Sequence, residues 1–99
     1  MTHFGAVAIP VDHPALPGHF PGDPIVPGVL LLAEIFALLA VAHSGRRAER
    51  LLQVKFLRPV RPEQNLIIVS QEMTGGRIGF EGMVDKACAL KGVVMMASS

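Results

Sequence analysis

The segment from Val29 to Ala42 most constrains what this chain can fold into, because Glu34 is its only polar residue. At 14 residues it is shorter than the roughly 20 that a helix needs to cross a bilayer, and a carboxylate near its middle opposes insertion. A helix that is apolar on all sides must be buried on all sides. We therefore expect a sheet wrapped around this helix, a partner subunit that covers it, or both.

The size and composition of the chain predict one globular domain over residues 1–99, because a second domain could not build its own core. Apolar residues make up 51% and charged residues 17%, which excludes disorder. The net charge is only +1 and the five aromatic residues are all Phe, so a nucleic-acid partner is not expected. A membrane partner is not expected either.

The sequence predicts no cofactor. Cys88 is the only cysteine, which excludes an internal disulfide and a zinc site built from several cysteines, and no pair of histidines has metal-ligand spacing on a helix. The first residues lack the basic and apolar regions of a secretory signal. We therefore expect a cytoplasmic protein in which Cys88 acts as a small buried hydrophobe.

The apolar pattern changes from helical to strand-like after the long helix. A first strand is expected at 4–11 and a proline-rich loop at 12–27, and the helix should end near Ser44 and Gly45. Alternation in the next segment places Leu52, Val54 and Phe56 on one face. The later strands are expected at 50–60, 65–73, 77–85 and 87–97, with a Gly-Gly turn at 74–77. This order predicts an α+β domain, an antiparallel sheet against one helix.

The candidate general bases are His13 and His19, which lie in the proline-stiffened loop. Imidazole is the usual acid or base near neutral pH. His3, in a terminal segment, and His43, in the last turn of the helix, are expected to be structural or solvated.

Gly28 stands at the start of the predicted helix, where backbone N–H groups have no partner within the helix and the macrodipole favours negative charge. A glycine also lets a ligand approach the backbone closely. A base at His19 and an amide donor at Gly28 would supply two requirements of carbonyl chemistry. An equally supported alternative is that His19 caps a turn and Gly28 merely begins the helix.

Two motifs resemble a known family. Residues 18–30, GHFPGDPIVPGVL, resemble the signature of the 3-hydroxyacyl-acyl carrier protein dehydratases, bacterial hydro-lyases of fatty-acid biosynthesis with a hot-dog fold. Residues 54–62, VKFLRPVRP, resemble the strand that follows the central helix in that family. The resemblance implies a sheet wrapped around the helix, a dimer that joins two sheets edge to edge, and a site at the dimer interface.

The resemblance also implies residue roles. His19 takes the α-proton of a 3-hydroxyacyl thioester, the backbone at Gly28 and Val29 polarises the thioester carbonyl, and an acid from the partner's helix helps the hydroxyl leave as water. In the family this acid follows the histidine by fourteen residues, a position that is Ala33 here. Glu34 comes one residue later, about 100° around the helix.

Glu34 therefore has several possible roles. It reaches the site through its length or through a π-bulge, or it lies at the dimer seam paired with an arginine, since a buried unpaired carboxylate would be costly. If it does neither, the protein acts slowly with His19 and Gly28 alone, or it is a subunit whose active partner is another chain.

Residues 46–61 carry a net charge of +5. We interpret this segment as a docking surface for an acidic carrier protein or for the phosphate of coenzyme A or phosphopantetheine. The alternative is an edge strand protected from aggregation by its cations. The residues concerned are Arg46, Arg47, Arg50, Lys55, Arg58 and Arg61.

The function expected from these features is dehydration of a 3-hydroxyacyl thioester to a trans-2-enoyl thioester, in fatty-acid or related lipid or polyketide biosynthesis. The partners would be an acyl carrier protein or coenzyme A thioester and a second copy of the chain, in a homodimer or a higher oligomer. Two alternatives stay open: a hot-dog thioesterase, and a weakly active or non-catalytic acyl-thioester-binding subunit of a heteromer, which Ala33 favours.

Overall fold

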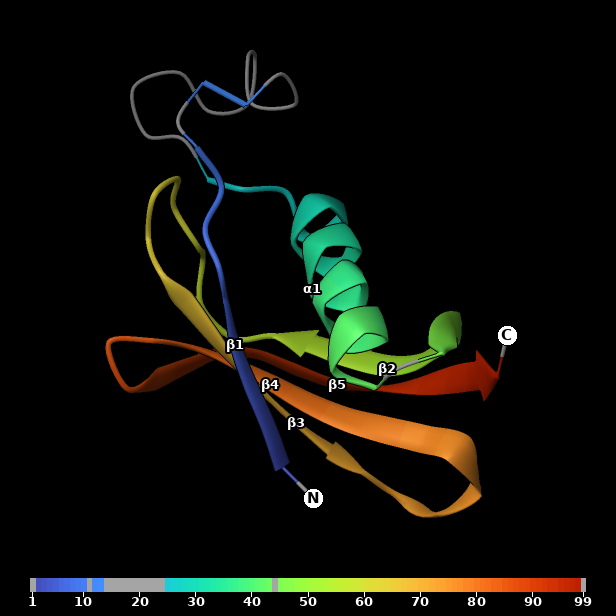
Figure 1. The fold of residues 1–99 in the computed structure, drawn as a ribbon. Coiled ribbons are helices and arrows are strands. Elements are labelled where there is room, and N and C mark those ends of the chain that lie inside the picture. The colour runs from blue at the N-terminus through green and yellow to red at the C-terminus, as the bar shows by residue number, and fades with distance from the viewer. Residues whose placement is uncertain (1, 11, 14–24, 44, 99) are drawn as a thin grey trace.

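The computed structural model describes residues 2–10, 12–13, 25–43 and 45–98 (Figure 1). Its five strands form one antiparallel sheet in the order β1-β3-β4-β5-β2, which leaves β1 and β2 at the two edges. The sheet curves around α1, the one α-helix among these described residues, as the sequence predicted. The elements are β1 Thr2–Val7, α1 Gly28–Ala42, β2 Arg46–Phe56, β3 Leu66–Glu72, a 3-10 turn Thr74–Gly76, β4 Arg77–Val84 and β5 Ala87–Ser98.

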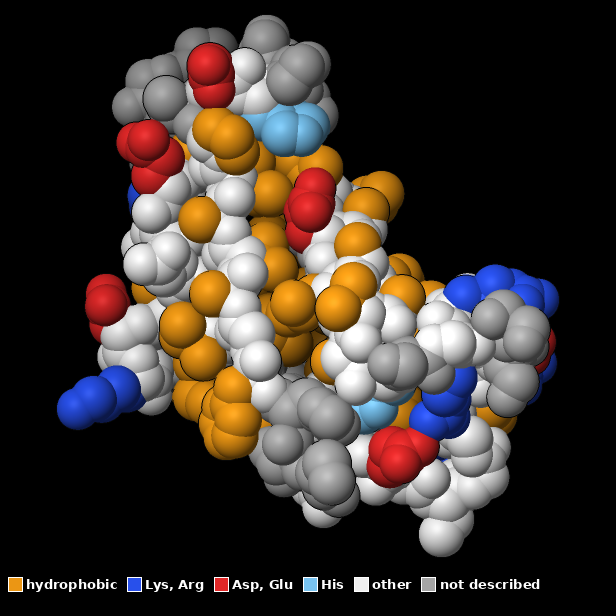
Figure 2. Space-filling model, in the orientation of Figure 1, with side chains coloured by type: hydrophobic (Ala, Val, Ile, Leu, Met, Phe, Trp, Pro, Cys, Tyr) orange, Lys and Arg blue, Asp and Glu red, His pale blue; other side chains and the backbone are white. Residues whose placement is uncertain are grey.

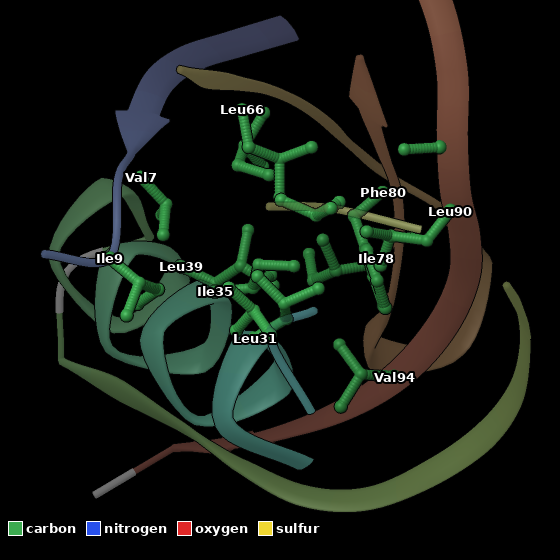
Figure 3. Packing of buried hydrophobic residues seen from close by; sticks show 14 of the residues in the cluster. Val7, Ile9, Leu31, Ile35, Leu39, Leu66, Ile78, Phe80, Leu90 and Val94 are labelled. Atoms are coloured by element: carbon green, nitrogen blue, oxygen red, sulfur yellow. The ribbon is translucent and has the colours of Figure 1, made fainter. Parts of the chain in front are cut away.

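The core lies between one face of α1 and the concave face of the sheet (Figure 3). The helix contributes Leu31, Ile35 and Leu39, which recur every four residues and so share one face. The sheet contributes mainly large aliphatic side chains, among them Leu66, Ile68, Ile78, Leu90 and Val94.

The described residues leave the opposite side of α1 uncovered. Val29 is 82% exposed and Val41 is 79% exposed, although both are apolar. The sheet therefore accounts for only part of the burial that the apolar helix requires, and the expectation of a covering subunit stays a prediction.

The bounds of α1 follow from local backbone chemistry. Pro27 precedes the first helical residue, and its carbonyl accepts hydrogen bonds from the N–H groups of Leu30 and Leu31 at 3.1 and 3.2 Å. The helix ends at Ala42, slightly before the predicted Ser44–Gly45, and Gly45 adopts the left-handed φ of 77° expected of a glycine after a helix.

The first two strands differ from their predicted bounds. β1 begins at Thr2 and ends at Val7 rather than spanning 4–11, because the Ile9 carbonyl accepts the Glu63 N–H and Pro10 has no N–H for a ladder. β2 spans Arg46–Phe56 rather than 50–60. Its charged first residues do not look like a strand, but their backbone pairs with the end of β5.

The single apolar face predicted for β2 is interrupted. The pairing of β2 with β5 shifts register between Ala48 and Arg50 and again between Leu51 and Gln53. Phe56 is 50% exposed and Val54 is half-buried, so the expected row of apolar side chains is only partly covered. Register shifts of this kind bend an edge strand and break its alternation.

The remaining strands and their turn confirm the predicted order. β3, β4 and β5 lie within one residue of the expected bounds. Gly75 and Gly76 both adopt positive φ, 75° and 79°, at the predicted Gly-Gly turn. On β4, Ile78 and Phe80 are buried as expected, whereas Val84 is half-buried, beyond a register shift at Gly82 and Met83.

Candidate functional site

The N-terminus of α1 has the features predicted for the centre of the site. Gly28 is the first helical residue and is half-buried. Among the described residues, none accepts a hydrogen bond from its N–H. The first amides of a helix carry the positive end of its dipole. The Gly28 N–H can therefore donate to an oxygen that gains negative charge during a reaction.

An apolar cavity of about 470 Å³ adjoins this helix terminus. Its walls are the segment entering α1, the first turns of α1, and the chain at and after the end of β2. The Val26 N–H donates to the Val60 carbonyl at 2.8 Å and so joins the first of these segments to the last. Apolar side chains predominate, as in most small-molecule sites. The lining residues are Ile25, Val26, Gly28, Val29, Leu31, Leu32, Phe56, Leu57, Arg58, Pro59 and Val60.

The cavity brings together the described parts of the two motifs that carry the resemblance. Ile25, Val26, Gly28 and Val29 come from the first motif and residues 56–60 from the second, although more than twenty residues separate the two groups in the chain. Val29 is at this terminus too, with its side chain largely exposed.

The predicted bases are only partly covered by the structure. His19 lies outside the described residues, so its role stays a prediction. His13 is described and half-buried, and its backbone N–H donates to the Pro10 carbonyl at 3.1 Å.

Glu34 lies on the side of α1 that faces β1. It lines a groove of about 360 Å³ between β1 and α1, together with Ala6, Ala37 and Val41. Hydrophobic side chains gather along this groove in Figure 2. The helix is α-helical over its whole length, Gly28–Ala42, so no π-bulge turns Glu34 toward the β2 side, where the cavity lies. Ala33, the family's acid position, is exposed.

Two polar pairs join the chain between the end of α1 and the start of β2 to β3. The buried His43 ring places Nε2 3.1 Å from Ser70 Oγ. The Arg46 guanidinium forms an ion pair with Glu72 and donates to the Gly76 carbonyl at 3.2 Å. The hydrogen bond and the positive charge of Arg46 hold the pKa of the Glu72 carboxyl below its usual value. We interpret these pairs as structural, as expected for His43.

The basic residues of 46–61 are spread along and beyond β2 rather than gathered at one point. Arg46 is at the end of α1 opposite to the cavity, in the ion pair with Glu72. Arg58 borders the apolar cavity, and Arg58 and Arg61 together line a neighbouring hollow of about 380 Å³ that also includes Asp85. Arg47, Arg50 and Lys55 are exposed on β2 between these two ends.

The described residues contain no group of three side chains that could hold a metal ion. The Cys88 thiol is half-buried and donates to the Leu90 carbonyl at 3.4 Å. Within the same part of the chain, no helix is both long enough and apolar enough to cross a membrane.

Comparison with known proteins identifies the family. The family model described as ApeI dehydratase matches residues 2–93. The chain belongs to the ApeI-like dehydratase family. This agrees with the resemblance to acyl carrier protein dehydratases carried by the two motifs.

Curated relatives carry the name 3-hydroxyacyl-[acyl-carrier-protein] dehydratase FabZ. One from Thermomicrobium roseum is 37% identical over 70 residues, which cover 63% of this chain and 47% of the relative. One from Klebsiella pneumoniae is 31% identical over 105 residues, which cover 92% of this chain and 70% of the relative. The chain spans about half the length of the first of these relatives.

Two solved structures share the fold of this family member. The dehydratase heterocomplex ApeI:P from Xenorhabdus doucetiae matches with a TM-score of 0.82 at 19% identity, over 97% of this chain and 87% of the other. A probable thioesterase from Bartonella henselae matches with a TM-score of 0.65 at 18% identity, over 97% and 88%. The predicted hot-dog fold is therefore confirmed, and fold alone does not separate the two activities.

Proposed function

We propose that this protein is a dehydratase that removes water from 3-hydroxyacyl thioesters of fatty-acid or related lipid biosynthesis. The observation that carries the proposal is the meeting of both family motifs at one apolar cavity, beside the Gly28 N–H at the positive end of α1. Family membership and the names of the curated relatives support this activity over thioester hydrolysis.

The proposed mechanism is an elimination. The acyl chain occupies the apolar cavity, and the backbone N–H groups of Gly28 and Val29 stabilise the negative charge that grows on the thioester oxygen. His19 takes the α-proton, the double bond forms between the α and β carbons, and the β-hydroxyl leaves as water with a proton from an acid. The reaction transfers no electrons to or from an external acceptor, so it requires no redox cofactor.

We propose that the chain dimerises through the β2 edge. None of the described strands pairs with the outer side of this edge, and an open edge presents unpaired backbone groups to another chain. Exposed apolar side chains on and near it, among them Leu52 and Leu57, together with Val29 on α1, provide hydrophobic contacts. A partner seated here would also cover part of α1.

The proposed mechanism also needs an acid that protonates the leaving hydroxyl. Because Ala33 cannot supply a proton and Glu34 lies on the β1 side of a regular helix, a second candidate function is supported. In it, the chain is one subunit of a heteromeric dehydratase whose other subunit provides the acid. The similar structure from Xenorhabdus doucetiae is itself named a dehydratase heterocomplex.

The test is a dehydration assay with (R)-3-hydroxyacyl carrier-protein substrates, in which formation of the enoyl thioester is measured. We expect wild-type turnover that is lost in His19→Ala, reduced in Glu34→Gln if Glu34 is the acid, and increased in Ala33→Asp. Wild-type turnover that survives in His19→Ala would contradict the mechanism. Binding of acyl pantetheine without turnover by the wild type or by Ala33→Asp would instead support the partner-subunit function.

We propose that Arg58 and Arg61 interact with the phosphate of the phosphopantetheine arm or with the acidic carrier itself. They are the basic residues of the segment that line hollows near the cavity. Arg58→Glu should lower kcat/KM for a carrier-bound substrate severalfold and less for a pantetheine thioester, because the charge contact is absent from the smaller substrate. Arg47→Glu on the exposed face of β2 is the matched control, and an equal effect of both variants would argue against a local contact.

A further inference from the structure

The aromatic ring of Phe56 lies directly on Gly28. A Cβ atom added to Gly28 would meet Phe56 Cζ at 2.7 Å and Cε1 at 3.0 Å, closer than ordinary van der Waals contact. Phe56 is the last residue of β2 and also lines the apolar cavity. The ring therefore packs against the Cα of Gly28 and forms part of the cavity wall beside the backbone amide that the proposed mechanism uses.

The ring has room to leave this position. Phe56 is half exposed at the end of an edge strand, so the described residues do not enclose its ring. Its contact with Gly28 is apolar and involves no hydrogen bond, so rotation about its side-chain bonds breaks no polar interaction. The chain after Phe56 leaves the sheet, since the N–H groups of Leu57 and Arg58 both point to the Ala89 carbonyl.

We infer that Phe56 is a specificity-determining residue whose ring covers Gly28 in the empty protein and is displaced when an acyl thioester binds. This inference rests on the proposed function, because it takes Gly28 as the donor to the thioester oxygen. An acyl thioester that reaches the Gly28 N–H through the cavity passes the ring that lines it, so the bound acyl group and the ring compete for the space beside Gly28.

Displacement of the ring makes binding depend on acyl length. A long acyl group fills the cavity and its contacts offset the loss of the Phe56 contact, whereas a short acyl group makes too few contacts to do so. Phe56 should therefore favour longer substrates. Phe56→Leu should raise the kcat/KM of a four-carbon substrate relative to a long one by roughly tenfold, the usual effect of a small change in pocket volume.

The closed position can be tested without any ligand. A phenyl ring this close to Gly28 shifts the resonances of the Gly28 amide and α protons, and Phe56→Leu should remove that shift from the NMR spectrum. Unchanged Gly28 resonances in Phe56→Leu would overturn the inference, whatever the outcome of the dehydration assay.

Displacement can be followed by fluorescence, because the chain contains no Trp and no Tyr. In Phe56→Trp the indole is the only strong fluorophore, and its emission should move to longer wavelength when a non-reactive long-chain acyl-pantetheine analogue binds. Phe4→Trp, exposed on the opposite edge strand, is the matched control and should not respond.

Calorimetric titration of the wild type and both Trp variants with the same analogue separates the possible failures. Binding with no change in the Phe56→Trp emission would overturn the inference and leave the proposed function standing. No binding to any of the three proteins would overturn the proposed function, and the inference with it.

Discussion

Gly28 is the residue at which local and long-range requirements meet. As the first residue of α1 it could be replaced by a better helix former, because its φ is not in the region reserved for glycine. The ring of Phe56 is what excludes a larger side chain. A sequence pattern can propose a close approach to this backbone, but the neighbour that approaches is defined by the tertiary fold.

At Gly28 we predict that substitution by alanine lowers activity more than it changes stability. The clash involves the far end of a side chain that can rotate outward, and alanine gains roughly 1 kcal/mol of helix propensity over glycine. Gly28→Ala should therefore keep a melting temperature close to wild type while turnover falls, since the added methyl group narrows the space beside the amide through which the thioester must approach. Thermal unfolding and the dehydration assay on one preparation test this. A large loss of stability would show that the Phe56 ring cannot move.

At Glu72 we predict a pH-dependent contribution to stability. Arg46 lowers the pKa of this carboxyl below its ordinary value of 4.5 in the folded protein. The contribution is therefore fully present above about pH 4.5 and is lost as the pH falls through the lowered pKa. Glu72→Gln should be less stable than wild type at pH 7, and the difference should shrink on acidification. Denaturant unfolding at several pH values measures it, with Glu49→Gln as the control; a difference independent of pH would contradict the prediction.

Among the elements, the sheet has glycines on its inner face at which neighbouring atoms pack closely against the backbone. Gly92 of β5 and Gly82 of β4 are both buried. A Cβ at Gly92 would lie 2.5 Å from the backbone oxygen of Gln53 on β2 and 2.8 Å from Phe80 Cζ. The backbone of β2 passes unusually close at the point where its register shifts, so the curvature of the sheet depends on this glycine.

For these strands we predict that Gly92→Ala destabilises the fold by about 1–3 kcal/mol, as overpacking of a well-filled core does. Gly79→Ala on the neighbouring strand is the matched control, because its new methyl group would meet the flexible side chain of Met73 at 3.2 Å rather than backbone. Urea unfolding of both variants measures the difference. Equal losses would mean that β2 yields easily and that the close approach is not a constraint.

On the scale of the whole molecule, the part of the chain that the structure describes leaves one side of the apolar helix uncovered and both edges of the sheet open. The edges differ in what lies beside them. The cavity adjoins β2, whereas the groove that contains Glu34 adjoins β1. Assembly through β2 would therefore place a second chain near the proposed site, and assembly through β1 would not.

We predict that Leu52→Asp converts the dimer to a monomer, because it buries a charge at the β2 interface without a partner. Phe4→Asp on β1, where the native side chain is 73% exposed, should leave the dimer intact. Sedimentation velocity on both variants measures the oligomeric state, and circular dichroism verifies folding. A monomer from Phe4→Asp and a dimer from Leu52→Asp would assign the interface to the opposite edge.

The sequence by itself determined the α+β class, the order of the elements and the two motifs of the family, because these depend on periodicity, turn residues and short-range spacing. The apolar run of α1 predicted a covering sheet, a partner subunit or both, and Gly75 and Gly76 predicted their turn. His19 stays a prediction from the first motif. Only the tertiary structure decided which residues meet across the chain: Phe56 on Gly28, Arg46 with Glu72, and Glu34 on the β1 side. Those contacts depend on the bend of the sheet and the register shifts of β2, which arise from packing between distant segments and leave no local pattern.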